Sequence, residues 1–370
     1  MSDAPPPRRL RAAVVGLGFI GPFHVDAVRR GGYGDVVALV GTDLARTEAR
    51  ARGLGIEQAS TDLGAVLADE RIDVVHVCTP NSSHVPIAQA VLDAGKDLVL
   101  EKPVATDFDS ARALARQAAR LGRHAMVALT YRGYPMIAQA KARVARGELG
   151  TLRLVQGAYL QDWLADERAT NWRVEQALSG PSRAVGDIGT HWLDLVEFVS
   201  GERVEAVIAD MPTFITERNG RPVDTEDAAT LLVRFGNGAR GSCLVSQISR
   251  GHKNSLWIEL TGSTETLRWE QEAAERLWFG RSDSISVVER EQDPSQLVGS
   301  PSPPAGHSEG WPAALRDLLR PFYAAIAAGQ SPPEPGAESS YPTLFDGARS
   351  IALLEAVIAS ARDQRWTFVG

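Results

Sequence analysis

Short apolar runs alternate with stretches of helical periodicity over the first 130 residues. Each run is too short for a helix and is bounded by glycine, proline or polar residues, as a fully buried strand is. Helical stretches lie between the runs, with the clearest at 21–30 and 107–121. Strands that alternate with helices in this way predict a doubly wound parallel sheet. The main predicted strands are 12–15, 36–40, 74–78, 98–100 and 125–129.

The pattern changes after a predicted helix at 137–146. From there to residue 288 the chain reads mostly as strands with short turns, which predicts an antiparallel sheet in a second, α+β domain. Phe235-Gly236-Asn237-Gly238 is typical of a hairpin between two of these strands. One helix, at about 186–199, interrupts them. The predicted strands are 152–159, 204–210, 228–235, 240–248, 256–261 and 266–270; a loop at 294–310 and helices near 313–328 and 343–361 follow.

These patterns divide the chain into three parts. Residues 1–10 are polar and proline-rich, and we expect a disordered tail there, not a signal peptide. We expect residues 11–130 to form the α/β domain, and residues 131–370 to form an α+β domain with a large, open, mostly antiparallel sheet. Helices on a single face of that sheet leave an apolar surface on the other. We therefore expect a homodimer or a homotetramer.

Composition excludes several classes of function. The net charge is −7, from 39 basic and 46 acidic residues, and no basic run stands out, which argues against nucleic acid. No apolar segment approaches the roughly 20 residues that span a bilayer, which argues against a membrane protein. The two cysteines, Cys78 and Cys243, are far apart, as expected in a reducing cytoplasm. The seven histidines show no metal-ligand spacing, so we expect no metal.

A glycine-rich turn follows the first strand. Gly16, Gly18 and Gly21 give the pattern GxGxxG, with Phe19 and Ile20 inside it, directly before a predicted helix. Such glycines allow a tight turn and a close approach of backbone N–H groups to a pyrophosphate, and the helix N-terminus favours that anion. The strand–turn–helix context predicts a dinucleotide site.

The end of the second strand bears on the choice of cofactor. A dinucleotide fold usually places an acid there to hold the ribose hydroxyls, but this chain has Gly41. The small residue, with Thr42 and Arg46 nearby, leaves room for a 2′-phosphate. We therefore expect NAD or NADP, with a weak preference for NADP. Asp43 could reach the ribose, but its position favours a helix cap.

Two further strand ends carry polar residues. Thr79, Pro80, Asn81 and His84 follow one strand, and Glu101-Lys102-Pro103 follows the next. Because ligands bind at the carboxyl ends of parallel strands, we expect these residues to contact the cofactor. Lys102 would lie at the mouth of that crevice, where a partly buried lysine can take part in catalysis. For His84, a first-turn helix residue without such a role is the alternative.

The helix predicted at 186–199 begins with Asp187 and His191. Four residues apart on a helix, they would share one face. The helix N-terminus disfavours a charged imidazole and the carboxylate favours it, so we expect His191 to titrate near neutrality. The alternative is an aspartate that complements the helix dipole and a packed histidine.

Together these motifs resemble the glucose–fructose oxidoreductase / inositol dehydrogenase / rhizopine-catabolism (GFO/IDH/MocA) family over nearly the whole chain. The resemblance implies a Rossmann domain for the nucleotide and an α+β domain for a sugar, a polyol or a related alcohol. It also implies that Lys102, Asp187 and His191 are the catalytic set and contact substrate. The motifs are Gly16-x-Gly18-x-x-Gly21, Thr79-Pro80-Asn81-x-x-His84, Glu101-Lys102-Pro103 and Gly186-Asp187-Ile188-Gly189-Thr190-His191.

A closer similarity is to the sugar-oxidising members of this family. Aromatic faces with amide and guanidinium groups suit a polyhydroxylated ring. The residues that carry this similarity, and that we expect to bind substrate, are Tyr131, Tyr159, Gln161, Trp163, Trp172 and Arg173. Core packing is the alternative for both tryptophans. The family's glycine-rich run before the catalytic helix is replaced here by Ser179-Gly180-Pro181-Ser182-Arg183, which alters the expected pocket.

The expected reaction is hydride transfer between a nicotinamide cofactor and a secondary alcohol or ketone of a sugar, an inositol or a related polyol. Either Lys102 or His191 could be the base that accepts the hydroxyl proton. Two alternatives share the fold. One is an NAD-dependent glycoside hydrolase or lyase that oxidises its sugar transiently. The other is a nucleotide-sensing protein without catalysis.

Overall fold

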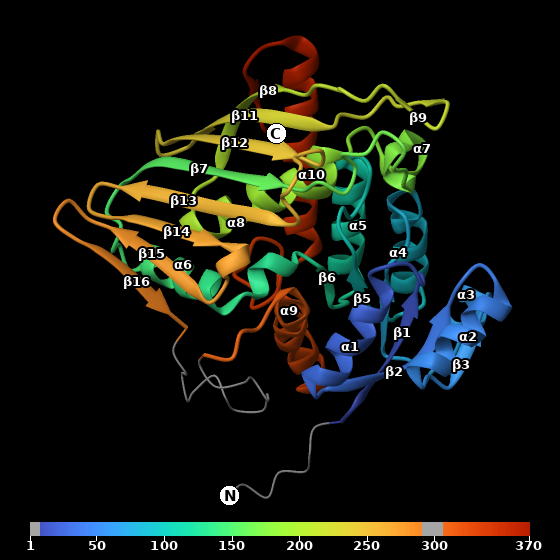
Figure 1. The fold of residues 1–370 in the computed structure, drawn as a ribbon. Coiled ribbons are helices and arrows are strands. Elements are labelled where there is room, and N and C mark those ends of the chain that lie inside the picture. Colours follow the sequence, from blue (N-terminus) through green and yellow to red (C-terminus); the bar gives the residue numbers. More distant parts are fainter. Residues whose placement is uncertain (1–7, 291–305) are drawn as a thin grey trace, which may run out of the picture.

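The computed structural model describes residues 8–290 and 306–370. Its first half is a six-stranded parallel sheet with the order β3-β2-β1-β4-β5-β6 (Figure 1), which confirms the doubly wound α/β prediction. Leu100 of β5 pairs with Val77 of β4 and Val127 of β6, so three carboxyl ends meet at one edge. The strands are β1 (Leu10–Val15), β2 (Gly34–Val40), β3 (Gln58–Ser60), β4 (Val74–Val77), β5 (Asp97–Leu100) and β6 (Ala125–Val127).

Helices cover both faces of this sheet. α4 and α5 pack on one face, and α1 and α2 contribute to the core on the other. The first helices are α1 (Gly21–Gly31), α2 (Leu44–Leu54), α3 (Leu63–Leu67), α4 (His84–Asp93) and α5 (Phe108–Arg120). Asp107 caps α5 by accepting a hydrogen bond from the Ser110 N–H at 2.8 Å, which explains where that helix begins.

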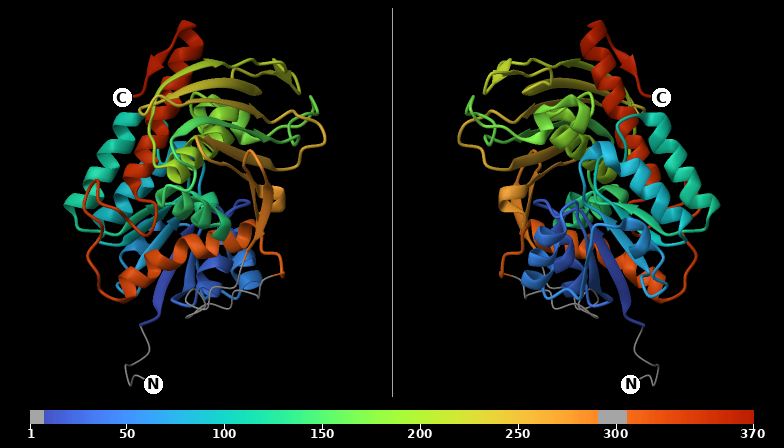
Figure 2. Two further views of the ribbon diagram at one scale, coloured as in Figure 1. Left: turned by 90° about the vertical axis from the view of Figure 1, so that its left-hand side faces the viewer. Right: turned by 90° about the vertical axis from the view of Figure 1, so that its right-hand side faces the viewer.

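The second half contains a nine-stranded sheet with the order β16-β15-β14-β13-β7-β12-β11-β8-β17. Its pairs are antiparallel except β7–β12, as predicted for the α+β domain. Figure 2 shows the sheet curving over α8, which leaves the outer face without helices. The strands are β7 (Leu152–Leu160), β8 (Val204–Asp210), β11 (Ala228–Phe235), β12 (Arg240–Ser246), β13 (Ser255–Gly262), β14 (Thr266–Glu270), β15 (Arg276–Gly280), β16 (Ile285–Glu289) and β17 (Thr367–Phe368), with a separate hairpin of β9 (Glu217–Arg218) and β10 (Arg221–Pro222).

The last two long helices return to the first sheet. Phe322 of α9 lies in one core with β1 and β2, and Ile351 of α10 lies in the other core of the Rossmann domain. The Val127 N–H also donates to Pro342 O at 3.1 Å. Part of the segment 131–370 therefore completes the layers around the first sheet. These helices are α6 (Pro135–Ala145), α7 (Gln176–Ser179), α8 (Thr190–Ser200), α9 (Trp311–Ala327) and α10 (Leu344–Asp363).

Some predicted boundaries were wrong. Leu10 begins β1 and is 3% exposed, so the predicted tail at 1–10 is too long; residues 1–7 lie outside the described residues. Most of the predicted loop at 294–310 also lies outside them. β15 and β16 were not among the predicted strands, because β16 is mostly exposed and lacks a continuous apolar run. No helix in the described ranges has the length and apolarity to cross a membrane.

Candidate functional site

The glycine-rich turn has the geometry that a pyrophosphate needs. Gly16 has φ +99°, and a Cβ there would lie 2.5 Å from the carbonyl oxygen of Cys78. A Cβ on Gly21 would lie 2.5 Å from the carbonyl oxygen of Gly16, whereas one on Gly18 would meet open space. Ile20 precedes α1 without a side-chain cap, and Phe19 is 81% exposed. The turn therefore presents uncapped N–H groups to an open surface, which fits a dinucleotide.

The end of β2 is open as well. A Cβ on Gly41 would lie 2.3 Å from Thr47 Oγ1, so packing leaves no room for an acid at this position. Asp43 caps α2 by accepting from the Arg46 N–H at 2.8 Å, as the sequence favoured. Thr42 and the Arg46 side chain are exposed beside it. The residues that could face a ribose are thus a hydroxyl and a guanidinium.

The loop after β4 is built by its own hydrogen bonds. Ser83 Oγ donates to Thr79 Oγ1 at 2.8 Å and to Pro80 O at 2.7 Å. Asn81 Nδ2 donates to Ser179 O at 2.8 Å, which links the nucleotide half to α7. Thr79, Pro80 and Asn81 therefore lie where the two halves meet.

Two residues predicted to contact cofactor point into the protein. His84 is 1% exposed, and its ring nitrogens lie 2.7 Å from Pro103 O and 2.8 Å from Thr79 O. Burial lowers the pKa of His84. The carboxylate of Glu101 faces His24 of α1 at 2.9 Å. Both side chains therefore stabilise the loops after β4 and β5 from the interior of the protein.

Lys102 meets Asp187 across the two halves. Its Nζ donates to the Asp187 backbone oxygen at 2.7 Å and to Oδ1 at 2.9 Å. Arg173 Nε lies 3.1 Å from the same Oδ1, and Gln247 Nε2 donates to Oδ2 at 2.8 Å. Burial raises the pKa of Asp187, but the charges of Lys102 and Arg173 outweigh it and hold that pKa well below its usual range. Asp187 is therefore a fixed carboxylate between two cations.

A π-helical turn, Val185–Gly189, places Asp187 before α8 begins. The buried Glu226 carboxylate accepts from the backbone N–H groups of Arg183 and Val185, which anchors the start of this turn. A π-helical turn contains more than 3.6 residues, so Asp187 and His191 are not one α-helical turn apart. The predicted α-helix over 186–199, with both residues on one α-helical face, was wrong in this respect.

His191 is 7% exposed and takes part in no hydrogen bond with the described residues. Its ring packs edge-on against Tyr131, with centroids 4.9 Å apart. Burial, and then the charge of Lys102, lower the pKa of His191 well below the ordinary value, although Asp187 opposes them. The expected titration near neutrality was therefore wrong, because burial outweighs the carboxylate. His191 is a neutral imidazole at neutral pH.

A closed set of hydrogen bonds lies beside this imidazole. Asn254 Nδ2 donates to Tyr131 OH at 3.1 Å, Tyr131 and Tyr159 hydroxyls are 2.5 Å apart, and Tyr159 OH donates to Asn254 Oδ1 at 2.7 Å. Gln161 Nε2 donates to the same Asn254 oxygen at 2.8 Å, and Trp163 Nε1 donates to Gln161 Oε1 at 2.8 Å. Burial raises the pKa of Tyr131 to about 12. These residues form a polar wall from the buried tyrosines to the surface.

Neither predicted tryptophan belongs to the core. Trp163 is 37% exposed, and Trp172 is partly exposed and carries the Arg173 guanidinium 4.5 Å from its ring centroid. Arg173 thereby joins Trp172 to Asp187. Of the residues in this site, the sequence analysis missed Gln247 and Asn254. They lie in the connection between β12 and β13, where no motif indicates them.

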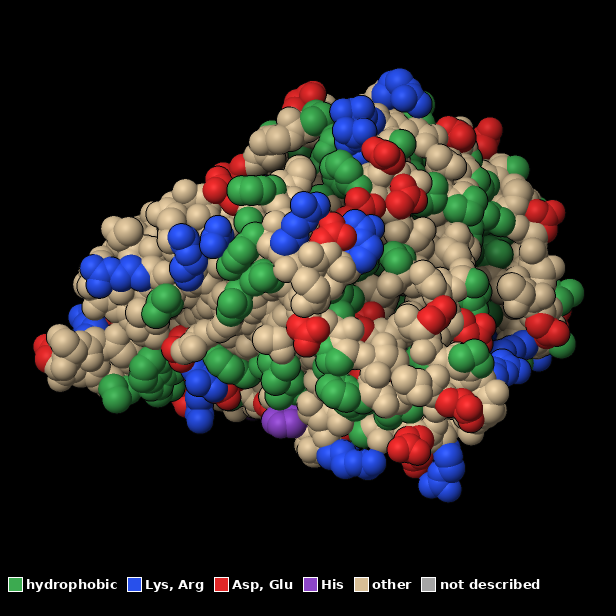
Figure 3. Space-filling view, turned by 90° about the horizontal axis from the view of Figure 1, so that it is seen from above, with side chains coloured by type: hydrophobic (Ala, Val, Ile, Leu, Met, Phe, Trp, Pro, Cys, Tyr) green, Lys and Arg blue, Asp and Glu red, His purple; other side chains and the backbone are tan. Residues whose placement is uncertain are grey.

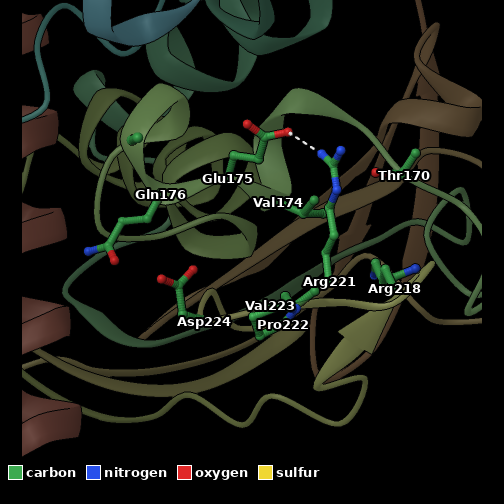
Figure 4. A pocket seen from close by; sticks show the side chains of 10 residues that line it. Thr170, Val174, Glu175, Gln176, Arg218, Arg221, Pro222, Val223 and Asp224 are labelled. Carbon is green, nitrogen blue, oxygen red and sulfur yellow. Dashed lines mark ion pairs between the residues drawn. The ribbon is translucent and has the colours of Figure 1, made fainter.

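A pocket of about 550 Å³ lies between the segment that follows Arg173 and the β9–β10 hairpin (Figure 4). Arg221 of this hairpin and Glu175 of the other segment form an ion pair of 4.0 Å. None of Lys102, Asp187 and His191 lines it. The lining residues are Thr170, Val174, Glu175, Gln176, Ala177, Arg218, Arg221, Pro222, Val223 and Asp224. Among the described residues, no group of three or more His, Cys, Asp or Glu side chains could hold a metal ion.

Comparisons with known proteins agree over both halves of the chain. A family model described as "Oxidoreductase family, NAD-binding Rossmann fold" matches residues 10–129, and one described as "GFO/IDH/MocA C-terminal domain" matches residues 137–268. Levoglucosan dehydrogenase of Pseudarthrobacter phenanthrenivorans is 28% identical over 403 residues, with 98% of each chain covered.

Two solved structures are similar over their full length. Levoglucosan dehydrogenase in complex with NADH and levoglucosan aligns with a TM-score of 0.90 and 28% identity, over 98% of this chain and 100% of that chain. An inositol dehydrogenase homologue from Azotobacter vinelandii in complex with NADH and myo-inositol aligns with a TM-score of 0.86 and 28% identity, over 98% of each chain.

Proposed function

Because this chain belongs to the GFO/IDH/MocA family of NAD-binding oxidoreductases, we propose that it transfers a hydride between a nicotinamide nucleotide and a secondary alcohol of a cyclic sugar or polyol. One observation carries the proposal. The ammonium of Lys102, the carboxylate of Asp187 and the neutral imidazole of His191 converge where the carboxyl edge of the parallel sheet meets the second half of the chain. A donor and a proton acceptor thus lie together past the carboxyl end of β5, the edge at which such sheets bind ligands.

In the oxidation direction, each group has a distinct role. The substrate hydroxyl donates its proton to the uncharged ring nitrogen of His191. Lys102 donates a hydrogen bond to the developing alkoxide, and Asp187 holds that ammonium in place. The nicotinamide, when bound, accepts the hydride that leaves the same carbon, so a ketone forms. We assign His191 as the base because its imidazole is neutral, whereas Lys102 Nζ is a donor that binds Asp187 O at 2.7 Å and Oδ1 at 2.9 Å.

The polar wall supports a polyhydroxylated ring as substrate. Asn254 and Gln161 offer amide groups, and the tyrosine hydroxyls stay protonated because burial raises their pKa values. The exposed Trp163 ring at the end of this wall can stack on the apolar face of a sugar. The relatives point the same way, since levoglucosan and myo-inositol are both cyclic polyols.

For the cofactor, we keep the weak preference for NADP over NAD. The packing of Thr47 against Gly41 excludes an acid at the ribose position, and the Arg46 guanidinium could pair with a 2′-phosphate. The similar proteins were solved with NADH, which supports NAD as an accepted cofactor. Both nucleotides should therefore support turnover.

We further propose a homodimer or a homotetramer in the cytoplasm. Leu154, Leu232 and Leu244 are 56%, 48% and 44% exposed on the helix-free face of the large sheet. Figure 3, seen from above, shows small hydrophobic patches between charged side chains on the side where β8 and β11 lie. Cys78 and Cys243 are free and buried, which is consistent with a reducing compartment.

A substrate screen tests this proposal directly. The purified protein is incubated with levoglucosan, inositols and aldoses, each with NAD and NADP, and nicotinamide absorbance is followed. Net reduction that His191→Asn abolishes would support the dehydrogenase. Sugar cleavage without net reduction would favour the hydrolase or lyase alternative. Nucleotide binding without any turnover across the screen would favour a sensing role.

A further inference from the structure

Four buried residues form a chain of hydrogen bonds behind the catalytic lysine. Tyr323 OH lies 2.7 Å from His76 Nε2, His76 Nδ1 lies 2.8 Å from His24 Nδ1, and His24 Nε2 lies 2.9 Å from Glu101 Oε1. We call this chain the Tyr323–Glu101 relay. Its histidines are fully buried, while Tyr323 and Glu101 are 3% and 8% exposed. It runs from α9 through β4 and α1 to the residue before Lys102.

The protonation states of Tyr323, His76 and Glu101 determine in which direction the hydrogen bonds of the relay are donated. Burial raises the pKa of Tyr323 well above its ordinary value, so the hydroxyl keeps its proton. Burial lowers the pKa of His76 well below its ordinary value, so that ring is neutral. Burial raises the pKa of Glu101, but the His24 hydrogen bond and the charge of Lys102 outweigh it, so the net pKa is lowered and the group is a carboxylate.

Only one neutral arrangement satisfies every donor. Tyr323 O–H donates to His76 Nε2, His76 Nδ1–H donates to His24 Nδ1, and His24 Nε2–H donates to the Glu101 carboxylate. The opposite direction would need a proton on both ring nitrogens of His24, because the Glu101 carboxylate can only accept. It would also leave the Tyr323 hydroxyl proton without an acceptor among the described residues. All donors therefore point toward Glu101.

Glu101 connects the relay to Lys102, the next residue in the chain. Its second oxygen accepts the Lys102 backbone N–H at 3.2 Å, and the charge of Lys102 acts on its carboxyl group. We propose that the Tyr323–Glu101 relay fixes a negative charge beside Lys102 and thereby positions that lysine for hydride transfer. The proposal rests on the function proposed above. It assigns positioning roles to four residues and makes α9 part of the catalytic apparatus.

Other charged groups around the relay do not replace it. His84 of α4 and the Cys78 thiol lie within electrostatic reach of Glu101, and burial keeps the thiol protonated because it raises the pKa of Cys78. Asp73 and Asp97 act on the Tyr323 hydroxyl, and both favour its protonated form. None of these groups supplies a carboxylate next to Lys102 in the chain, so Glu101 alone fills that position.

The substitution Glu101→Gln removes the charge of this side chain and keeps its shape. The amide can donate to His24 Nε2, after which both imidazoles change tautomer and Tyr323 accepts at the far end. Three hydrogen bonds survive in reverse, but the charge beside Lys102 is lost. We expect kcat/KM to fall about tenfold, the typical size of a charge-assisted hydrogen bond, with nucleotide Kd within about threefold of wild type. The half-maximal pH of kcat/KM, which His191 sets, should also move down, because the site then loses a negative charge that favours the imidazolium.

Tyr323→Phe removes only the terminal donor, and Tyr341→Phe is its matched control. Tyr341 is 4% exposed and its hydroxyl lies 2.7 Å from His124 Nδ1, but that pair does not reach Glu101. Both changes remove one buried tyrosine–histidine hydrogen bond and should cost similar stability. Only Tyr323→Phe should lower kcat/KM, by about threefold, and shift its pH profile. Equal effects of the two variants on kcat/KM would refute the relay.

Nitrogen-15 NMR of the imidazoles tests the relay without turnover. In the wild type, His24 should carry its proton on Nε2 and His76 on Nδ1, and Glu101→Gln should reverse both. Opposite tautomers in the wild type would overturn the relay even if the enzyme oxidises sugars. If the substrate screen is negative, the proposed function fails, while the predicted tautomers and their reversal would still uphold the relay. If Glu101→Gln keeps the wild-type kcat/KM, Glu101 has no positioning role and that part of the proposal is wrong.

Discussion

Replacing Asp187 by asparagine tests the centre of the site with little change of shape. The carboxylate lies 2.9 Å from Lys102 Nζ and 3.1 Å from Arg173 Nε. At an effective dielectric constant of about 20, a charge pair at 2.9 Å attracts by roughly 6 kcal/mol before desolvation is counted. Removing one partner of a buried pair typically costs about 3–5 kcal/mol. Because the Arg173 side chain is 32% exposed and can turn to water, we expect about 3 kcal/mol less stability.

The effect on catalysis should be larger than the effect on binding. Lys102 keeps one bond to the backbone oxygen of residue 187 but loses its charged partner, so its ammonium is held less firmly. Loss of one oriented donor at a developing oxyanion typically lowers kcat about 100-fold to 1,000-fold, and we expect a fall in this range. Nucleotide affinity should stay within about threefold, since Asp187 acts on the reacting group.

The pH profile gives this prediction a second readout. Asp187 raises the pKa of His191 against burial and against Lys102. Without the carboxylate, that pKa falls further, so the rising limb of kcat/KM should move to lower pH. The assay is kcat/KM for alcohol oxidation between pH 5 and 9, roughly the range in which a histidine base titrates, with urea unfolding measured in parallel.

Asp194→Asn is the matched control for stability. Asp194 is also a buried carboxylate near the start of α8, and it pairs with Arg132 at 2.5 Å away from Lys102. Its substitution should cost similar stability and leave kcat/KM within about threefold, since it touches no reacting group. If Asp187→Asn keeps wild-type kcat, or if Asp194→Asn loses as much activity, the assignment of Asp187 is incorrect.

Four further predictions follow from the same geometry. Lys102→Ala should abolish turnover while nucleotide Kd, measured by calorimetry, changes by less than about tenfold; wild-type-like turnover would end its catalytic role. In the wild type, the half-maximal pH of kcat/KM should lie below about 6.5, and this limb should disappear in His191→Asn, because burial lowers the pKa of that imidazole. Arg46→Ala should reduce the ratio of kcat/KM with NADP to that with NAD, and an unchanged ratio would refute the 2′-phosphate contact. Light scattering at micromolar concentration should give a dimer or a tetramer that Leu244→Glu weakens, because this leucine is exposed on the open sheet face; a monomeric wild type would contradict this.

The sequence alone determined the arrangement of the first half and several site residues. Runs of apolar residues separated by helical stretches left one solution, a parallel sheet, because strands buried on both faces must be apolar throughout. Gly16 and Gly21 were predictable from the GxGxxG pattern between a strand and a helix, and the structure shows that a Cβ at either position would overlap a backbone oxygen. Lys102 was predictable as a candidate because it lies just past the carboxyl end of β5, with only Glu101 between them. These inferences need only local geometry and the period of the pattern.

Tertiary structure decided which distant residues meet at the site and how deeply they are buried, because a local sequence pattern does not contain this information. Gln247 and Asn254 reach the site because the connection from β12 to β13 lies beside β7, and their neighbours in the chain carry no motif. The π-helical turn at Asp187 depends on Glu226, a residue far along the chain whose carboxylate binds the start of the turn. The pKa of His191 follows from its burial, which only the packed chain defines.

The two ends of the chain show the same division most clearly. Sequence order placed the segment after residue 130 in a second domain, but Tyr323 of α9 lies against β4 of the first sheet, 2.7 Å from His76. A helix's amphipathic pattern indicates that one face is buried but not against which sheet, since any apolar surface satisfies it. Only the path of the folded chain brings residue 323 behind residue 101, and the environment of Lys102 depends on that path.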